Sequence, residues 1–129
     1  MDTVKFVEPI SDVITIHPYW AWNAWVKGKK NFEEFLNSAV AFANQSNKPL
    51  LASETGWGSL DDAKRAESLA YELTELKKRG IGWLVHLLHH SLVADAHRPE
   101  FGPVTIAGYM AFIKADGSLR PYHKLFNEY

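Results

Sequence analysis

Glu54 stands at the end of a short apolar stretch, and this position makes it the first candidate for chemistry. Residues 48–52 read Lys-Pro-Leu-Leu-Ala, which predicts a strand that begins at Pro49 and is buried on both faces. The loop that follows, residues 55–58, contains two glycines and a tryptophan. Parallel α/β folds place their reactive groups at the carboxyl ends of strands. A carboxylate there can serve as a nucleophile.

Two other apolar stretches end in side chains that could join this carboxylate. The β-branched run 12–17 and the apolar run 81–87 each predict a buried strand. Parallel strands end on one rim, so side chains at their carboxyl ends can converge. The side chains expected to line a substrate site beside Glu54 are His17, Tyr19, Trp20, Trp57, Trp83 and His86.

This set of residue types fits attack on a sugar carbon. The carboxylate would be the nucleophile, a tyrosine hydroxyl would hold its orientation, and aromatic rings would stack on the sugar. The reaction also needs a second carboxyl group, about 5 Å from the first for retention of configuration and farther away for inversion.

Two amphipathic helices separate the three predicted strands. Apolar residues recur at helical spacing over residues 32–43, after an Asn31 and Glu34 pair that resembles a capping box. A second apolar stripe runs through residues 63–76, and Gly80 is expected to follow the last helical turn. The alternation of strand and helix predicts an α/β fold with three parallel strands and right-handed crossover helices.

Composition narrows the class of protein. A hydrophobic content of 47% and a charged content of 22% are typical of a globular domain, and a net charge of -1 favours neither nucleic acid nor an acidic membrane as partner. No apolar run approaches the roughly 20 residues of a membrane span, and the first eight residues lack the apolar core of a signal peptide. The chain has no cysteine, which excludes disulfides and thiolate chemistry. Without repeats or linkers, residues 1–129 are expected to form one domain.

Taken together, the strand ends resemble the last three β/α units of a clan A glycoside hydrolase, most closely a cellulase-like (β/α)8 barrel. The motifs that carry the resemblance are residues 12–20, residues 53–57, residues 82–86 and the turn at residues 116–121. By this resemblance Glu54 matches the catalytic nucleophile of the seventh strand, and His17 and Tyr19 match a subsite element of the sixth. The resemblance implies a half TIM barrel from a retaining hydrolase of β-linked glucan or mannan that needs no cofactor.

The chain also departs from the family pattern. The family's acid/base, a Glu after an Asn on the fourth strand, has no counterpart here. Glu8 is followed by Pro9 and looks superficially similar, but no strand and helix fit between it and the strand at 12–17. His86 stands where the platform tryptophan of the eighth strand is expected. A whole barrel takes about 250 residues, so we expect either a homo-oligomer or a complementing N-terminal half-barrel to cover the open sheet.

Other interpretations stay open from the residues alone. Glu54 could cap the following helix or pair with a lysine, and the aromatic side chains could simply pack in the core. The chain could be a catalytically inactive remnant that binds sugar or forms oligomers, or a truncated reading frame without a function of its own. The histidines at 86, 89, 90 and 97 could suggest a metal site. No acidic ligand or His-x-x-x-His helix supports such a site, so we expect no bound metal.

Overall fold

The computed structural model describes residues 2–20, 28–56, 59, 61–88, 111–114 and 116–129. The chain clusters into two compact units. The first unit comprises Met1–Thr55 and Glu75–Leu84, and the second comprises Gly56–Thr74 and Val85–Tyr129. Trp57 and the histidines at 89, 90 and 97 lie outside the described residues.

A three-stranded sheet with the order β1-β2-β3 forms the centre of the fold. Its strands are β1 (Ile14–Ile16), β2 (Leu50–Thr55) and β3 (Gly82–Val85). β1 and β2 are parallel, with Ile14 opposite Leu50 and Ile16 opposite Ala52. The prediction of an α/β fold with three parallel strands and helices between them is confirmed. β1 is shorter than residues 12–17, since Pro18 has no N–H with which to continue the ladder.

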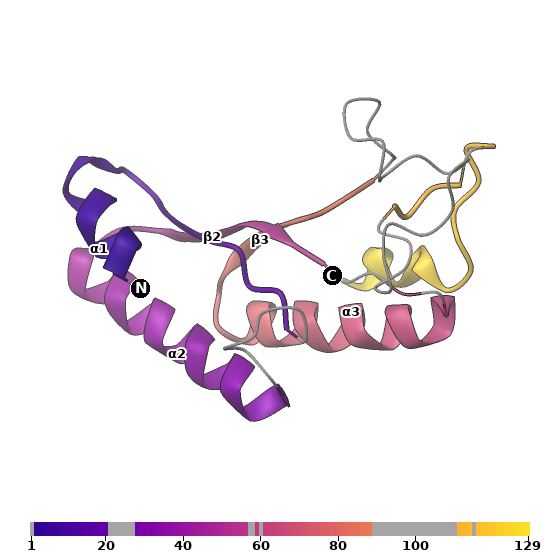
Figure 1. Ribbon diagram of the computed structural model, residues 1–129, viewed down its shortest axis with the longest axis horizontal. Helices are drawn as coiled ribbons and strands as arrows, with labels where there is room; N and C mark the ends of the chain where they lie inside the picture. The colour runs from indigo at the N-terminus through magenta and orange to yellow at the C-terminus, as the bar shows by residue number, and fades with distance from the viewer. Residues whose placement is uncertain (1, 21–27, 57–58, 60, 89–110, 115) are drawn as a thin grey trace. The chain divides into compact units, whose positions relative to one another are not determined.

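Helix α2 (Gly28–Ser46) connects β1 to β2 and runs along one face of the sheet (Figure 1). Its buried side chains, Phe32, Leu36, Ala39 and Ala43, repeat at helical spacing as predicted. The predicted capping box is wrong, because Asn31 lies within the helix, which begins at Gly28. Lys29 and Lys30 are good helix formers, and they extend the helix toward the N-terminus by three residues.

Helix α3 (Asp62–Lys78) connects β2 to β3. The Asp61 carboxylate accepts hydrogen bonds from the backbone N–H groups of Ala63 at 2.9 Å and Lys64 at 3.1 Å, which caps the first turn. Leu69, Leu73 and Leu76 are fully buried along one stripe of the helix. Gly80 follows the helix with a φ of 65°, which confirms its predicted place after the last turn.

The order of the strands gives both crossovers the same direction along the sheet, since each strand lies next to the one that precedes it in the chain. Ile14 and Ile16 are buried and Thr15 is exposed, while in β3 Gly82 and Leu84 are exposed. A parallel sheet of this order, with a helix between successive strands, matches part of a (β/α)8 barrel.

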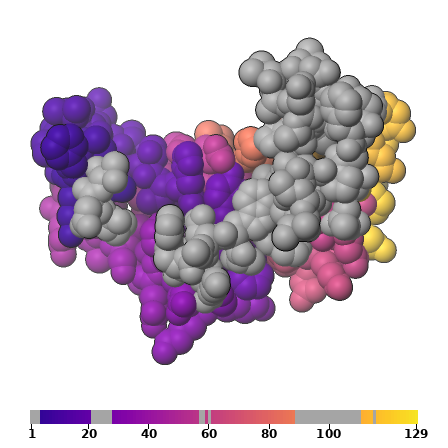
Figure 2. Space-filling view, viewed as in Figure 1, coloured from indigo at the N-terminus to yellow at the C-terminus, as the bar shows by residue number. Residues whose placement is uncertain are grey.

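The N-terminal residues of the first unit form two short helices, α1 (Asp2–Val7) and η1 (Glu8–Ile10). Phe6 is 86% exposed and Ile10 is 89% exposed, so each presents an apolar side chain at the surface. The segment that holds them is drawn in indigo in the space-filling view (Figure 2).

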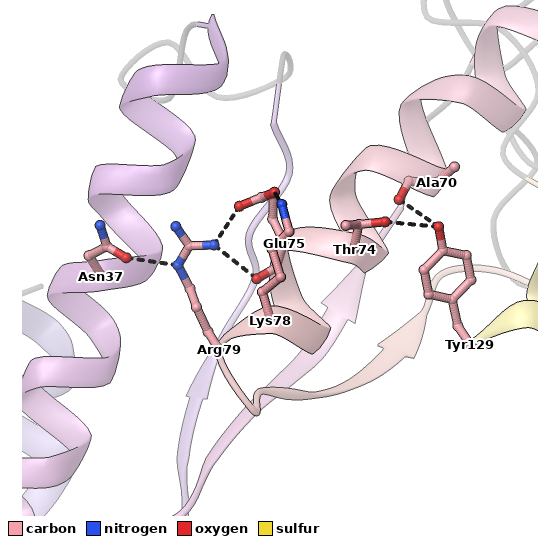
Figure 3. A network of polar contacts seen from close by, with 7 residues as sticks. All are labelled: Asn37, Ala70, Thr74, Glu75, Lys78, Arg79 and Tyr129. Carbon is pink, nitrogen blue, oxygen red and sulfur yellow. Dashed lines mark hydrogen bonds and ion pairs between the residues drawn. The ribbon is translucent and has the colours of Figure 1, made fainter.

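The second unit is built by the last residues of the chain packed on α3. Its last element is the 3-10 helix η4 (His123–Glu128), in which His123 and Leu125 are buried. The Tyr129 hydroxyl donates a hydrogen bond to the Ala70 carbonyl at 2.9 Å and lies 2.9 Å from the Thr74 hydroxyl (Figure 3). None of the helices that the structure describes is long and apolar enough to cross a membrane.

Candidate active site

Tyr19 and Glu54 meet at the carboxyl end of the paired strands β1 and β2. Tyr19 follows β1 after a two-residue loop, and Glu54 is the penultimate residue of β2. The Tyr19 hydroxyl donates a hydrogen bond to Oε1 of Glu54. Tyr19 is only 8% exposed, so its ring is held by packing while Glu54 stays half-buried. The structure therefore brings together the predicted nucleophile and the hydroxyl predicted to orient it.

A second hydrogen bond joins the same two segments. Oγ1 of Thr55, the last residue of β2, donates to the carbonyl of Pro18 at 3.0 Å, and Thr55 is fully buried. Thr55 was not among the sequence candidates. The sequence signal that could have identified it is a hydroxyl directly after the strand-end carboxylate, together with a proline just after the neighbouring strand.

The other sequence candidates lie in different environments. The His17 side chain is exposed, and its backbone carbonyl accepts a hydrogen bond from the Tyr19 N–H at 3.2 Å. Trp20 is half-buried in the first unit, and Trp83 is half-buried on β3. His86 is half-buried in the second unit. Their roles as substrate-binding residues remain predictions, as does that of Trp57.

Gly56 allows the chain after β2 to pass close to the backbone that follows β3. Its φ is 141°, and a Cβ atom there would lie 2.5 Å from the carbonyl oxygen of His86. Real Cβ atoms essentially never come so close to an oxygen. The glycine after Thr55 is thus required by the backbone geometry of this loop.

Glu8 belongs to the opposite end of the sheet. Its Oε1 forms an ion pair with Nζ of Lys48 at 2.6 Å, and Lys48 precedes the amino end of β2. Glu54 follows Lys48 by six positions of extended chain, a span of about 20 Å. Glu8 therefore cannot serve Glu54 as the second carboxyl group, in agreement with its sequence position.

Glu75 is the centre of a second charged cluster in the first unit (Figure 3). Lys78 binds its Oε1 at 2.5 Å, and Arg79 binds its Oε2 at 2.6 Å while donating to Asn37 of α2 at 2.8 Å. The hydrogen bond from Lys78, together with Arg79, holds the pKa of the Glu75 carboxyl below its ordinary value. Glu75 is therefore an ionised structural group that links α3 to α2, not a proton donor.

The residues whose positions the structure describes do not form a metal site. In that part of the chain, no three His, Asp or Glu side chains gather where they could hold an ion. The candidate site is thus a hydrogen-bonded carboxylate at a strand end, with aromatic residues on the segments around it.

No protein-family model and no curated protein matches the chain. Among the solved structures that match its fold are two β-glucuronidases. A β-glucuronidase from Faecalibacterium prausnitzii gives a TM-score of 0.70 at 15% identity over 99% of this chain and 23% of its own. A Bifidobacterium dentium β-glucuronidase complexed with coumarin-3-O-glucuronide gives 0.62 at 14% identity over 92% of this chain and 20% of its own.

The chain spans about a fifth to a quarter of the length of these two proteins. At 14–15% identity the likeness is one of fold. It agrees with the parallel sheet and the helices that connect its strands. The three strands and two crossover helices of this chain have the fold of part of a (β/α)8 barrel.

Proposed function

We propose that this chain supplies the nucleophile, Glu54, of a retaining β-glycoside hydrolase whose acid/base carboxyl comes from another polypeptide segment. The observation that carries the proposal is the hydrogen bond from the Tyr19 hydroxyl to the Glu54 carboxylate at the carboxyl end of β2. In (β/α)8 barrels this end of the strands carries the catalytic residues. The barrel fold of the matched β-glucuronidases supports the same class of enzyme.

The proposed chemistry uses the two oxygens of Glu54 differently. Tyr19 binds Oε1, which leaves Oε2 to attack the anomeric carbon. The bond from that carbon to the leaving oxygen breaks, and the leaving group takes a proton from the acid/base. Water then hydrolyses the covalent glycosyl-enzyme, so that the configuration is retained. Without a general acid, the first step with a natural leaving group would be slower by about 10²–10⁴-fold.

The substrate class is a β-linked sugar. The sequence motifs, which resemble those of cellulase-like barrels, favour a β-glucan or a mannan. The matched structures are β-glucuronidases, which adds β-glucuronides to the substrates worth testing. The aromatic residues Trp20, Trp57 and Trp83 would stack on the sugar rings.

Covalent trapping tests this proposal without the missing acid/base. A 2,4-dinitrophenyl 2-deoxy-2-fluoro-β-glycoside has a leaving group that departs without protonation, and its fluorine slows hydrolysis of the adduct. The glucoside, mannoside and glucuronide would each be incubated with the chain and analysed by peptide mass spectrometry. We expect one sugar on the peptide that contains Glu54, and none in Glu54→Gln. Labelling of other carboxylates alone would contradict the proposal.

The alternative is an inactive remnant that binds sugar or mediates oligomer formation. Two ion pairs favour this alternative. Glu8 pairs with Lys48, and Glu75 pairs with Lys78 and Arg79, so neither carboxylate is available as a proton donor. On this alternative none of the three reagents labels Glu54. Sugar binding, measured by tryptophan fluorescence titration with β-linked oligosaccharides, would then be the same in the wild type and in Glu54→Gln.

A further inference from the structure

The loop between Ile16 and Tyr19 extends the contact between β1 and β2 beyond their last paired residues. Ile16 is opposite Ala52 at the end of the ladder. Continuing that register by two residues would place Pro18 opposite Glu54, but proline has no N–H to donate. The Pro18 carbonyl nevertheless has a partner, the hydroxyl of Thr55 at 3.0 Å. One side-chain hydrogen bond thus joins the segments where the ladder has ended.

This bond acts on Tyr19 through a single peptide group. The Pro18 carbonyl and the Tyr19 N–H belong to the same planar unit. Thr55 binds the oxygen of that unit, and the His17 carbonyl accepts from its N–H at 3.2 Å. With both polar atoms of the peptide held, the Cα atom of Tyr19 is fixed, and its buried ring has only two torsions left to define where the hydroxyl lies.

We propose that Thr55 is a positioning residue, whose hydroxyl sets the Tyr19 hydroxyl against Glu54 by holding the Pro18–Tyr19 peptide. Thr55 is the covalent neighbour of Glu54, and Pro18 is the covalent neighbour of Tyr19. The two hydrogen bonds therefore close a small ring through both segments. A β-branched side chain suits this position, since its γ-methyl restricts χ1 and so aims the hydroxyl. The inference rests on the proposed function only in treating Glu54 as the nucleophile.

The test measures the hydrogen bond from Tyr19 to Glu54 by nuclear magnetic resonance of the whole chain. The protein is labelled with ¹³C at the glutamate side-chain carboxyls, and Glu54→Gln identifies the Glu54 signal. Tyr19→Phe gives the chemical shift of Glu54 without its hydroxyl partner. Thr55→Val replaces the hydroxyl by a methyl group of similar size, and Thr55→Ser keeps the hydroxyl. Thr15→Val makes the same chemical change at an exposed position on β1 and is the matched control.

We expect the Glu54 signal of Thr55→Val to move in the same direction as that of Tyr19→Phe. Thr55→Ser and Thr15→Val should stay at the wild-type shift. The inference would be overturned if the Glu54 signal kept its wild-type chemical shift in folded Thr55→Val or in Tyr19→Phe. If Thr55→Val does not fold, Thr55→Ser provides the test. A change in the Glu54 chemical shift of Thr55→Ser as large as that of Tyr19→Phe would overturn the inference, because it would show that packing, not the hydroxyl, positions the Tyr19 ring.

The outcome is separate from that of the proposed function. If Glu54 is not labelled by any fluoroglycoside, the proposed function fails. The carboxyl shifts would still report whether Thr55 positions Tyr19.

Discussion

At the scale of single residues, the three positions Glu54, Thr55 and Gly56 carry three different constraints. Glu54 accepts from Tyr19, and Thr55 donates to Pro18. Gly56 has a φ of 141° and approaches the His86 carbonyl so closely that a Cβ atom would overlap it. The Glu-Thr-Gly tripeptide therefore combines a reactive group, a side-chain tether and a backbone conformation that only glycine adopts readily.

Gly56→Ala should destabilise the chain by more than Gly117→Ala. Both glycines have positive φ values, 141° and 81°, but a Cβ at Gly117 would meet no atom within 4 Å. We expect a loss of about 1 kcal/mol for Gly117→Ala from backbone strain alone. Gly56→Ala should lose roughly 3 kcal/mol, because the backbone must also move to relieve the overlap. Urea unfolding followed by circular dichroism measures both, and equal losses would contradict the predicted clash.

At the scale of elements, helix α3 holds the C-terminal segment through buried polar contacts. Arg65 is fully buried, donates to the Ala111 carbonyl at 2.7 Å and lies 4.9 Å from the centre of the Phe112 ring. Burial lowers the pKa of Arg65 to about 9, with a further lowering from Arg120 and an opposing rise from Asp62. The guanidinium therefore stays charged at neutral pH, and Arg120 binds Asp62 at 2.7 Å beside it.

His123 should make this element sensitive to acid. Burial lowers its pKa, the hydrogen bond to the Pro121 carbonyl opposes that shift, and among the neighbouring charges Arg65 and Arg120 lower it while Asp62 raises it. The unfolded chain therefore takes up a proton near pH 6.5, at which the native imidazole is still neutral. The contribution of His123 to the free energy of unfolding should be constant above about pH 6.5. Below that pH it should fall until the native pKa is reached, by about 1.4 kcal/mol for each unit by which the pKa is lowered.

The measurement is the free energy of unfolding between pH 7.5 and pH 5, compared with that of His123→Phe. Phe at this position keeps a ring near Phe112 and Phe126, whose centres lie 5.8 Å and 6.3 Å from that of His123. The difference between the wild type and the variant should change with pH only below about 6.5. A difference that does not vary with pH would show that His123 titrates alike in the native and unfolded chains.

At the scale of the whole molecule, the sheet has exposed residues on β1 and on β3. They are Thr15, Gly82 and Leu84, of which Leu84 is 58% exposed. Phe6 and Ile10 add two further apolar side chains at the N-terminus. Exposed apolar surface beside open strand edges favours association. In a (β/α)8 barrel, the remaining strands close the sheet, so that it has no open edges.

We propose that the chain on its own self-associates, and that in its working form it pairs with a complementing half-barrel. Size-exclusion chromatography with light scattering should give a mass above the monomer's 14.6 kDa at micromolar concentration. Leu84→Lys should shift the population toward the monomer, because it replaces an exposed apolar side chain of β3 by a charged one. Leu119→Lys, at a position 42% exposed in the second unit, is the control that should not. A stable wild-type monomer would contradict the proposal.

The elements could be predicted from the sequence because each depends on nearby residues. The spacing of Phe32, Leu36 and Ala39 identifies the buried face of α2, and Gly80 identifies the end of α3. Boundaries were less accurate, as the start of α2 at Gly28 instead of Asn31 illustrates. A helix start depends on small differences in free energy between adjacent residues, which a capping pattern alone does not resolve.

What the sequence by itself determined was the alternation of strands and helices and the place of Glu54 at a strand end. Only the tertiary structure decided that Tyr19 reaches Glu54, that Thr55 holds Pro18, and that Glu8 pairs with Lys48 at the other end of the sheet. These contacts join residues that are 35, 37 and 40 positions apart in the chain. Their geometry depends on how β1 and β2 pair, with Ile14 opposite Leu50 and Ile16 opposite Ala52. These partners are 36 positions apart in the chain, so no pattern among neighbouring residues specifies which of them meet.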